Sequence, residues 1–474
     1  MSKELPSANA HLLGRAPLAI GPSLDIGHWS LVIRHRAPFT TSPSASYSRA
    51  MSAATRALVL LLAINLFNYL DRYILAAVEP LIAAHFFSAA DENAMAKTGA
   101  LATAFLVSYM LLAPVFGWLA DRFPRWWIVA GGVGLWSLAS GWSGMATTFG
   151  MLIWTRVFVG IGEAAYGPAA PTIISDLYPV EKRGRMLSFF YLAIPVGSAL
   201  GYAFGGAVGQ HLGWRWPFYL VTIPGLVLAG LCLLMRDPRA AQRAVKKEPM
   251  KLADVLALFR IRSYVFNTAA MTAMTFAIGG IAFWLPRYLY KDRAADFGGA
   301  PSLGQINLIF GGVMVVAGLC ATLLGGWVGD RLRVRYPSAY FLVSGFGMLL
   351  AFPCTLLMLH TPFPTAWIFV FLAIFFLFFN TGPANAALAN VTPPETRATA
   401  FALNILMIHA LGDAISPPLI GAIAGKTSMN LAFMGVSATM VLASALWFLG
   451  ARYLAADTAA VEARDGHRTS NIEP

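Results

Sequence analysis

Six ionisable residues lie inside stretches of the chain that are otherwise apolar. An ionised side chain at the centre of a membrane-spanning helix costs about 2.5–3.5 kcal/mol by insertion scales. Such residues are therefore expected to pair with one another or to face a water-filled cavity, where carboxylates and imidazoles exchange protons. The six residues are Asp71, Arg72, Arg156, Glu163, His409 and Asp413.

Arg156 and Glu163 are seven residues apart in one predicted helix, so both lie on nearly the same face, about 10 Å apart along the axis. This separation is too long for a direct ion pair in most rotamers, but both side chains can reach one cavity. Asp71 and Arg72 point about 100° apart, and we expect Asp71 to point toward the cavity, near Glu163 or Arg156 on a neighbouring helix. Two interpretations stay open for Asp71 and Glu163, namely proton carriers or partners in a permanent ion pair with Arg156.

The two arginines also allow alternatives. Arg156 can bind an anionic group through its planar guanidinium, or it can be the partner of a carboxylate. Arg72 is seven residues before Glu79 and can pair with neighbours on its own helix instead.

The last two ionisable residues, His409 and Asp413, are four positions apart and therefore share a helix face. They can form a proton relay, or His409 can be a hydrogen-bonded packing residue. Gly412 and the Ser416-Pro417 break predict a helix that bends at this point. In the span before it, Asn380 and Asn385 are polar points that we expect along the cavity.

The surroundings of these residues indicate a membrane protein. Of 474 residues, 58% are hydrophobic and 12% are charged, with a mean hydropathy of +0.64. A soluble chain carries about twice that charged fraction. The apolar blocks are roughly 20 residues or longer, which is enough to cross about 30 Å of hydrocarbon as helix. We predict an all-α integral membrane protein of twelve transmembrane helices, at about 57–85, 98–121, 126–147, 149–177, 184–211, 215–235, 264–290, 303–329, 338–359, 364–391, 397–424 and 428–453.

The net charge of +12 reflects the orientation of the chain in the membrane. Outside the first 50 residues and the spans, about 21 of 27 Lys and Arg residues fall on one side if both termini lie there, as the positive-inside rule requires. We therefore predict a multi-pass protein of the bacterial inner membrane with cytoplasmic N- and C-termini, and no nucleic-acid partner.

The two halves of the chain repeat. Gly117-Trp-Leu-Ala-Asp121-Arg122 recurs as Gly326-Trp-Val-Gly-Asp330-Arg331, and Pro179-Val-Glu-Lys-Arg183 recurs as Pro393-Pro-Glu-Thr-Arg397. Repeated halves are typical of transporters that rock around a midplane site. The predicted organisation is a disordered tail at 1–50, two pseudo-symmetric six-helix bundles at 51–235 and 263–455, a cytoplasmic linker at 236–262 and a disordered tail at 456–474.

The loop Gly117-x-x-x-Asp121-Arg122-x-x-Arg125 resembles the signature loop of the major facilitator superfamily. The resemblance implies a gate between helices that uses Asp121, Arg122 and Arg125 together with Asp176, and a second copy at Asp330 and Arg331. Pro124 departs from the pattern, since a glycine is usual there.

Finer motifs resemble the spinster-like branch of this superfamily. They are Asn68-Tyr69-Leu70-Asp71-Arg72-Tyr73, Arg156-x-x-x-Gly160-x-Gly162-Glu163, Phe190-Tyr191-x-Ala-Ile-Pro195-Val-Gly197-Ser198 and His409-Ala-Leu-Gly412-Asp413. The resemblance implies proton-coupled alternating access that moves lysophospholipids or sphingoid phosphates, with Tyr69 near the substrate.

Other functions are less well supported by the sequence. Small organic anions or sugar acids are the alternative substrates, and a transporter-like receptor is the alternative of another class. The sequence contains no His-Glu-x-x-His and no Gly-x-Ser-x-Gly motif, so we predict no enzyme, no cofactor and no metal. The expected partners of this chain, predicted to be a monomer, are a small amphipathic or anionic substrate, protons and membrane lipid.

Overall fold

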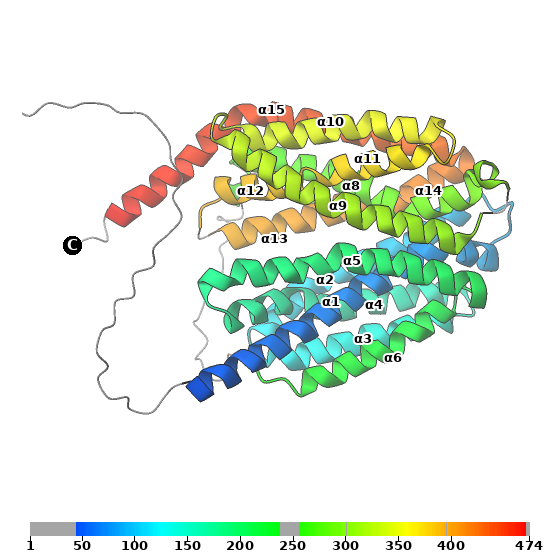
Figure 1. Ribbon diagram of the computed structural model, residues 1–474, viewed down its shortest axis with the longest axis horizontal. Coiled ribbons are helices and arrows are strands. Elements are labelled where there is room, and N and C mark those ends of the chain that lie inside the picture. The colour runs from blue at the N-terminus through cyan, green and yellow to red at the C-terminus, as the bar shows by residue number, and fades with distance from the viewer. Residues whose placement is uncertain (1–43, 238–255, 300, 395, 471–474) are drawn as a thin grey trace, which may run out of the picture. The chain divides into compact units, whose positions relative to one another are not determined.

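The computed structural model describes residues 44–237, 256–299, 301–394 and 396–470, and within these ranges the chain is helical with no strand (Figure 1). Residues from Ala50 onward cluster as one unit. Its first group of helices comprises α1 (Ser44–Phe86), α2 (Ala94–Ala120), α3 (Arg125–Gly144), α4 (Phe149–Leu177), α5 (Val180–Leu212) and α6 (Trp216–Leu233).

The second group contains the same number of predicted spans, two of which are broken within the membrane-spanning length. It comprises α8 (Arg262–Arg287), the π-helical turn η2 (Tyr288–Asp292), the 3₁₀ turn η3 (Ala294–Phe297), α9 (Leu303–Arg333), α10 (Ala339–His360), α11 (Ala366–Phe378), α12 (Thr381–Val391), α13 (Arg397–Ile408), the π-helical turn η4 (His409–Asp413), α14 (Ser416–Lys426) and α15 (Met429–Ser470).

The predicted fold class is confirmed. Eleven helical segments among the described residues are long and apolar enough to cross a membrane. The twelfth, α3, is longer than the 18-residue α6 at 20 residues but is less apolar, because it contains several glycines and serines, and it packs between α4 and α6. Because a helix needs about 20 residues to cross the hydrocarbon, α3 completes the two groups of six.

The two breaks have local causes. Between α11 and α12, the Asn380 amide donates to the carbonyl oxygen of Leu377 at 2.8 Å and is fully buried, so it replaces a helical hydrogen bond at the turn. Between α13 and α14, the π-helical turn precedes Pro417 and Pro418, which lack the N–H that a continuous helix needs. The bend predicted at Gly412 is therefore present.

Both termini of the described chain differ from the predicted disordered tails. Helix α1 begins at Ser44, inside the tail predicted at 1–50, and α15 continues to Ser470, inside the tail predicted at 456–474. Asp457 accepts a hydrogen bond from the backbone N–H of Ser263 at 2.8 Å, which anchors the extended α15 to the start of α8. Of the predicted linker 236–262, residues 238–255 lie outside the described residues.

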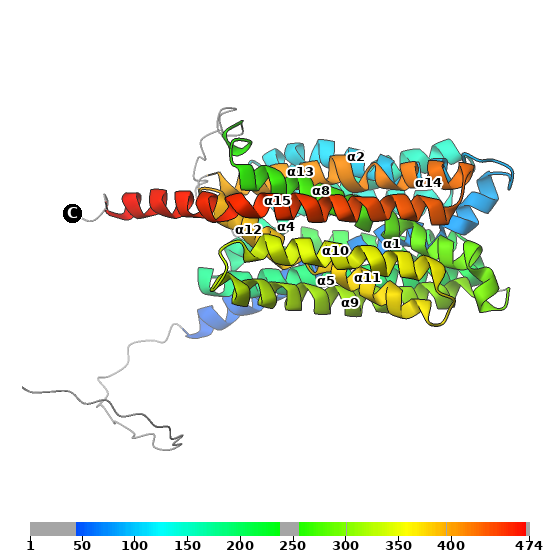
Figure 2. The same cartoon turned by 90° about the horizontal axis from the view of Figure 1, so that it is seen from above.

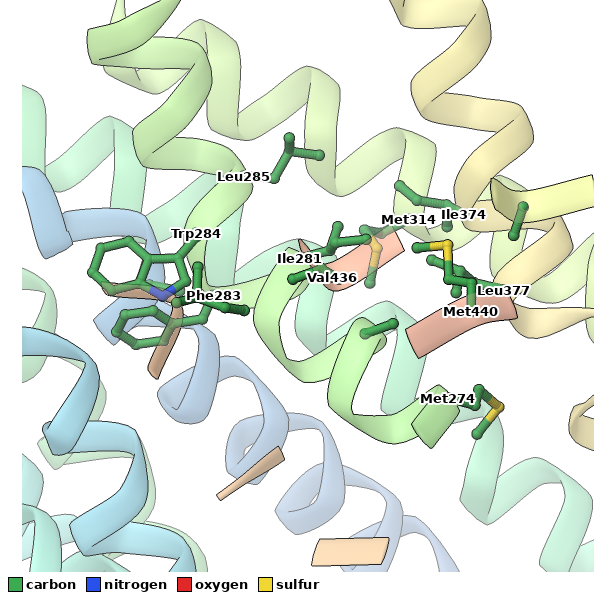
Figure 3. Packing of buried hydrophobic residues seen from close by; sticks show 14 of the residues in the cluster. Met274, Ile281, Phe283, Trp284, Leu285, Met314, Ile374, Leu377, Val436 and Met440 are labelled. Carbon is green, nitrogen blue, oxygen red and sulfur yellow. The ribbon is translucent and has the colours of Figure 1, made fainter. Parts of the chain in front are cut away.

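Small residues bring helices into close contact. A Cβ atom at Gly201 of α5 would lie 2.5 Å from the carbonyl oxygen of Leu70 in α1, and one at Gly197 would lie 2.6 Å from that of Leu66. Between the two groups, α5 packs on α9 and α2 packs on α14. A buried core that includes Met274, Trp284, Met314, Ile374 and Met440 of the second group (Figure 3) continues into the first group, where Ile74 and Tyr202 belong to the same cluster.

We expect Gly201→Ala to destabilise the protein by about 1–3 kcal/mol, because the new methyl group overlaps backbone that cannot move aside. Gly230→Ala in α6 is the matched control, since no atom lies within 4 Å of its added Cβ and alanine favours the helix. Thermal melting of the two purified variants, followed by size-exclusion chromatography, measures the difference. Equal melting temperatures would show that the α1–α5 contact is loose.

Candidate functional site

The bundle has two ends, which we call the basic end and the far end. The basic end carries the α2–α3, α4–α5, α9–α10 and α12–α13 connections, with Arg122, Arg125, Arg183 and Arg331. The far end carries the α1–α2, α3–α4, α5–α6 and α14–α15 connections. The candidate site lies between these ends.

A cavity of about 120 Å³ lies between the two groups of helices. Space of this size holds on the order of ten water molecules. Four charged side chains line it, with Arg72 from α1, Arg156 and Glu163 from α4, and Asp413 from η4. Arg156 and Glu163 therefore share one cavity, as their spacing predicted. The other lining side chains include Tyr73, Phe105, Phe283 and Pro417.

Glu163 pairs with Arg72. Arg72 Nη2 lies 2.5 Å from Glu163 Oε2, and the Glu163 side chain is only 1% exposed. The Arg72 guanidinium also lies over the rings of Phe105, Tyr69 and Tyr109 at 4.7, 4.9 and 5.7 Å, where cation–π attraction stabilises it. Neither the alternative pairing of Arg72 on its own helix nor that of Glu163 with Arg156 is observed.

Glu79 instead joins the two groups of helices toward the far end. Arg287 Nη1 of α8 lies 3.1 Å from Glu79 Oε2, and the Thr98 hydroxyl of α2 donates to Oε1 at 2.7 Å. Glu79 is 1% exposed. Sequence reasoning missed this contact because Arg287 ends a helix in the other half of the chain, and no spacing relates it to Glu79.

Arg156 is a buried cation whose charge is only partly compensated. Its Nη2 donates to the Ser143 hydroxyl at 2.5 Å and its guanidinium lies 5.2 Å from the Phe218 ring centroid. Its buried Nε has no hydrogen-bond partner, and within the described part of the chain it forms no direct ion pair. The nearest countercharges are Asp71 and Glu163.

Asp71 lies behind the cavity wall, in contact with α3. It accepts a hydrogen bond from the Ser140 hydroxyl through Oδ1, while its buried Oδ2 has no hydrogen-bond partner. Arg156 is its main electrostatic neighbour. Burying an ionised carboxylate with an unpaired oxygen is costly, so Asp71 depends on Arg156 when it is charged. Ser140 and Ser143 were not foreseen, since hydroxyls in an apolar span give no charge signal.

His409 and Asp413 contact each other, as their spacing predicted. His409 Nδ1 lies 2.9 Å from Asp413 Oδ1 and 3.0 Å from Oδ2. The π-helical turn that carries them is held to α2 by the Thr103 hydroxyl, which donates to the Ala414 carbonyl oxygen at 2.5 Å. Asp413 is thus the one charged side chain that the second half of the chain adds to the described lining of the cavity.

Five predicted residues do not line the cavity. Asp71, which was expected to point toward it, is turned about 100° from Arg72 and lies against α3. His409 contacts Asp413, which does line it. Tyr69 lies next to the site through its ring, which packs on Arg72. Asn380 is fully buried at the α11–α12 break, and the Asn385 amide donates to Thr381 of its own helix at 2.8 Å. Both asparagines satisfy backbone groups of their own span, which is why the structure does not bring them to the path.

Arg125 organises the basic end. Its Nη1 lies 2.7 Å from Asp176 Oδ2, the partner predicted from the signature loop. Its Nη2 lies 2.6 Å from Asp237 Oδ1, and its backbone N–H donates to Asp237 Oδ2 at 2.8 Å. Asp237, at the start of the predicted linker, was missed. Pro124 precedes α3 with φ −57°, a value that suits a helix start.

The other residues of the signature loop and of its repeat lie mainly beside aromatic side chains. The Arg122 guanidinium lies 3.9 Å from the Trp118 ring centroid, and Gly117 has only Pro168 near its position. Asp121 follows α2 as its C-cap. In the repeat, Asp330 accepts a hydrogen bond from the Tyr340 hydroxyl at 2.7 Å, and Arg331 lies 5.9 Å from the Trp327 ring.

Sequence comparisons identify the family of the chain. The family model described as Major Facilitator Superfamily matches residues 61–379. Protein spinster of Drosophila melanogaster is 37% identical over 378 residues, covering 78% of this chain but only 61% of that protein. Protein spinster homolog 1 of Homo sapiens is 38% identical over 388 residues, covering 77% of this chain and 72% of that protein.

Solved structures share the fold. A bacterial homologue of the human lysosomal transporter Spinster, in an inward-facing and unoccupied conformation, superposes with a TM-score of 0.74 at 21% identity, over 85% of this chain and 98% of that one. A D-xylose–proton symporter superposes with a TM-score of 0.66 at 18% identity, over 85% and 97% of the two chains.

We expect Arg125→Gln to destabilise the protein far more than Arg122→Gln. Removing one partner of a buried ion pair costs about 3–5 kcal/mol. The Arg125 side chain is 1% exposed and contacts two carboxylates, whereas Arg122 is exposed and lies on a tryptophan. Melting temperatures of the two variants test this. Equal melting temperatures of the two variants would show that the ion pairs of Arg125 stabilise the protein no more than the exposed contact of Arg122 with Trp118 does.

Proposed function

The chain belongs to the major facilitator superfamily, among its spinster-like transporters, and we propose that it couples protons to the movement of an amphipathic anion. The proposed substrate class is a lysophospholipid or a sphingoid phosphate. The chain is a multi-pass membrane protein, and we place it in a bacterial inner membrane with both termini cytoplasmic, on the distribution of its Lys and Arg residues.

The environment of Arg156 is the main support for the proposed substrate class. It lines the cavity, yet Arg72 rather than Arg156 takes the Glu163 carboxylate. A phosphate or carboxylate entering the cavity would supply the direct ion pair that Arg156 lacks and a partner for its unpaired Nε. The phenyl and tyrosyl side chains at the same cavity would contact the apolar part of an amphipathic substrate.

Asp71 and Glu163 are the proposed proton carriers. Both carboxylates are almost fully buried, and each is held by a single type of contact that helix movement would alter. Asp71 depends on the charge of Arg156, and Glu163 depends on Arg72. A carboxylate whose countercharge is engaged elsewhere takes up a proton, because burial opposes its charged form. The His409–Asp413 pair is a candidate relay on the other side of the cavity.

Alternating access is the proposed mechanism. The halves are linked toward the far end by Glu79 with Arg287, by the Tyr202 hydroxyl with the Ala282 carbonyl oxygen at 2.5 Å, and by Gln210 with α9. Opening that end would require these contacts to break while the halves rock about the midplane site. A small-residue contact between the halves would allow the movement: a Cβ atom at Gly311 of α9 would lie 2.8 Å from the Ala199 carbonyl oxygen of α5, so the two backbones meet with no large side chain between them.

Small organic anions are the second candidate substrate class. The cavity of about 120 Å³ is smaller than the 300–1,000 Å³ of pockets that enclose drug-sized ligands. It therefore accommodates a small anion or a headgroup, while a lipid chain needs additional space. A transporter-like receptor shares the same binding chemistry and differs in that it moves no substrate.

The direct test is flux into proteoliposomes. Labelled lysophospholipid and sphingosine-1-phosphate are supplied with and without an imposed pH gradient, and small organic acids are supplied in parallel. Gradient-dependent flux of a lipid is expected. Movement of the acids alone would favour the second candidate, and the absence of all flux from folded protein would favour the receptor.

We expect Arg156→Gln to weaken uptake of an anionic substrate at least about tenfold, because a charge-assisted hydrogen bond contributes roughly 1.5–3 kcal/mol. Uptake of a neutral analogue should change little. Arg215→Gln, at the far end beside Trp214, is the control. Equal losses for the anionic and the neutral substrate would make Arg156 a structural residue.

We expect Asp71→Asn and Glu163→Gln to abolish accumulation driven by a pH gradient and to leave counterflow exchange partly intact. Both changes keep the shape of the side chain but remove the group that binds the proton. Asp91→Asn is the control, since Asp91 pairs with Lys97 on the surface. Wild-type dependence on the gradient in both variants would refute their role as proton carriers.

A further inference from the structure

A second hollow, of 430 Å³, lies on the flank of the second group of helices. Its walls are α8, α13 with η4, and α15, which lie next to one another in Figure 2. The lining is almost wholly apolar, and three lining side chains form an exposed rim: Val265 at 39%, Leu411 at 50% and Leu442 at 53%. We call this hollow the flank groove.

The flank groove opens toward lipid rather than toward the central cavity. Leu411 lies two residues from both His409 and Asp413 on a helical turn, so it projects from the side opposite to them. The three walls belong to membrane-spanning segments. Because an unfilled hollow forfeits the dispersion contacts of its walls, and because hydrocarbon surrounds these segments, an acyl chain is the matching occupant.

The basic end of the flank groove is positively charged. Phe259 lines the groove at this end, and the guanidinium groups of Arg262 and Arg452 lie 5.0 and 5.4 Å from one ring, that of Tyr453. The nearby acid, Asp457, already accepts a hydrogen bond from the backbone of α8. Two arginines at the level where a helix leaves the membrane attract anionic lipid headgroups, each strengthening binding about fivefold.

We propose that the flank groove is a binding site for an anionic phospholipid from the leaflet at the basic end. One acyl chain lies between α8, η4 and α15, and the phosphate lies against Arg262 and Arg452. Such a lipid contacts Leu411 on the back of the π-helical turn whose front carries His409 and Asp413. It therefore supports the bend that faces the central cavity, while remaining separate from the transported substrate.

Native mass spectrometry of the full chain tests the headgroup. The protein is extracted from vesicles that contain equal amounts of phosphatidylglycerol and phosphatidylcholine, and retained lipid is counted. Wild type should retain phosphatidylglycerol in preference, and Arg262→Gln combined with Arg452→Gln should reduce that preference about thirtyfold, as expected for the loss of two charged contacts. Arg335→Gln is the matched control, since Arg335 lies beside Tyr336 in the α9–α10 connection at the same end.

Three further variants test whether the charges and the groove itself bind the lipid. Arg262→Lys with Arg452→Lys preserves the charges and should retain the preference, which separates charge from folding. Ala269→Trp fills the groove and should remove bound phosphatidylglycerol, whereas Leu323→Trp on the exposed face of α9 should not. Equal retention of the two lipids by wild type, unchanged retention by Ala269→Trp, or a lipid-free dimer joined through α15 would each overturn the proposal.

Discussion

The cost of holding charge away from water is the constraint on which the rest of this structure depends. Arg72, Arg156, Glu163 and Asp71 lie within two helices of one half, and a chain of marginal stability cannot leave them unpaired. The direct Arg72–Glu163 ion pair offsets most of that cost, because Glu163 is almost completely buried and its carboxylate lies 2.5 Å from the Arg72 guanidinium. The aromatic rings around Arg72 and the hydroxyls of Ser140 and Ser143 offset part of the remaining cost, while Asp71 Oδ2 and Arg156 Nε stay buried without a hydrogen-bond partner.

This division of partners gives the two arginines different capacities. Arg72 is held by a carboxylate and by rings, so an incoming anion must compete with Glu163 for it. Arg156 contacts one hydroxyl and one ring and forms no direct ion pair with its two neighbouring carboxylates among the described residues, so an incoming anion displaces no direct ion pair from it. A buried cation of this kind is retained at a cost in stability, and such a cost is characteristic of a binding group.

The extent to which the sequence predicts this arrangement depends on whether the signal lies along one helix or between helices. The twelve spans were predicted from the length of the apolar blocks and the two halves from repeated motifs. The His409–Asp413 contact and the shared face of Arg156 and Glu163 follow from helical periodicity. The Arg125–Asp176 pair was predicted only through a resemblance. The partner of Arg72 and the Glu79–Arg287 contact depend on which helices are neighbours and how they are rotated, and no spacing in a single chain encodes that.

Helix ends and breaks show the same limit. The bend at Gly412 was predicted from glycine and proline, because these residues act on their own backbone. The break at Asn380 was not, because it depends on an asparagine that is buried only after α10 and α11 pack. The continuation of α15 depends likewise on Asp457 reaching the start of α8.

The positions of Asp71 and Arg156 also constrain how a proton and a substrate can influence each other. A charged Asp71 attracts Arg156 and so weakens the hold of Arg156 on any other anion. A proton on Asp71 removes that competition, and linkage requires that the reverse holds, so an anion bound to Arg156 favours protonation of Asp71. In the proposed mechanism, the two events reinforce each other within one half of the protein. When the halves rock, they then expose Asp71 and Arg156, which are already coupled, to one side of the membrane or the other.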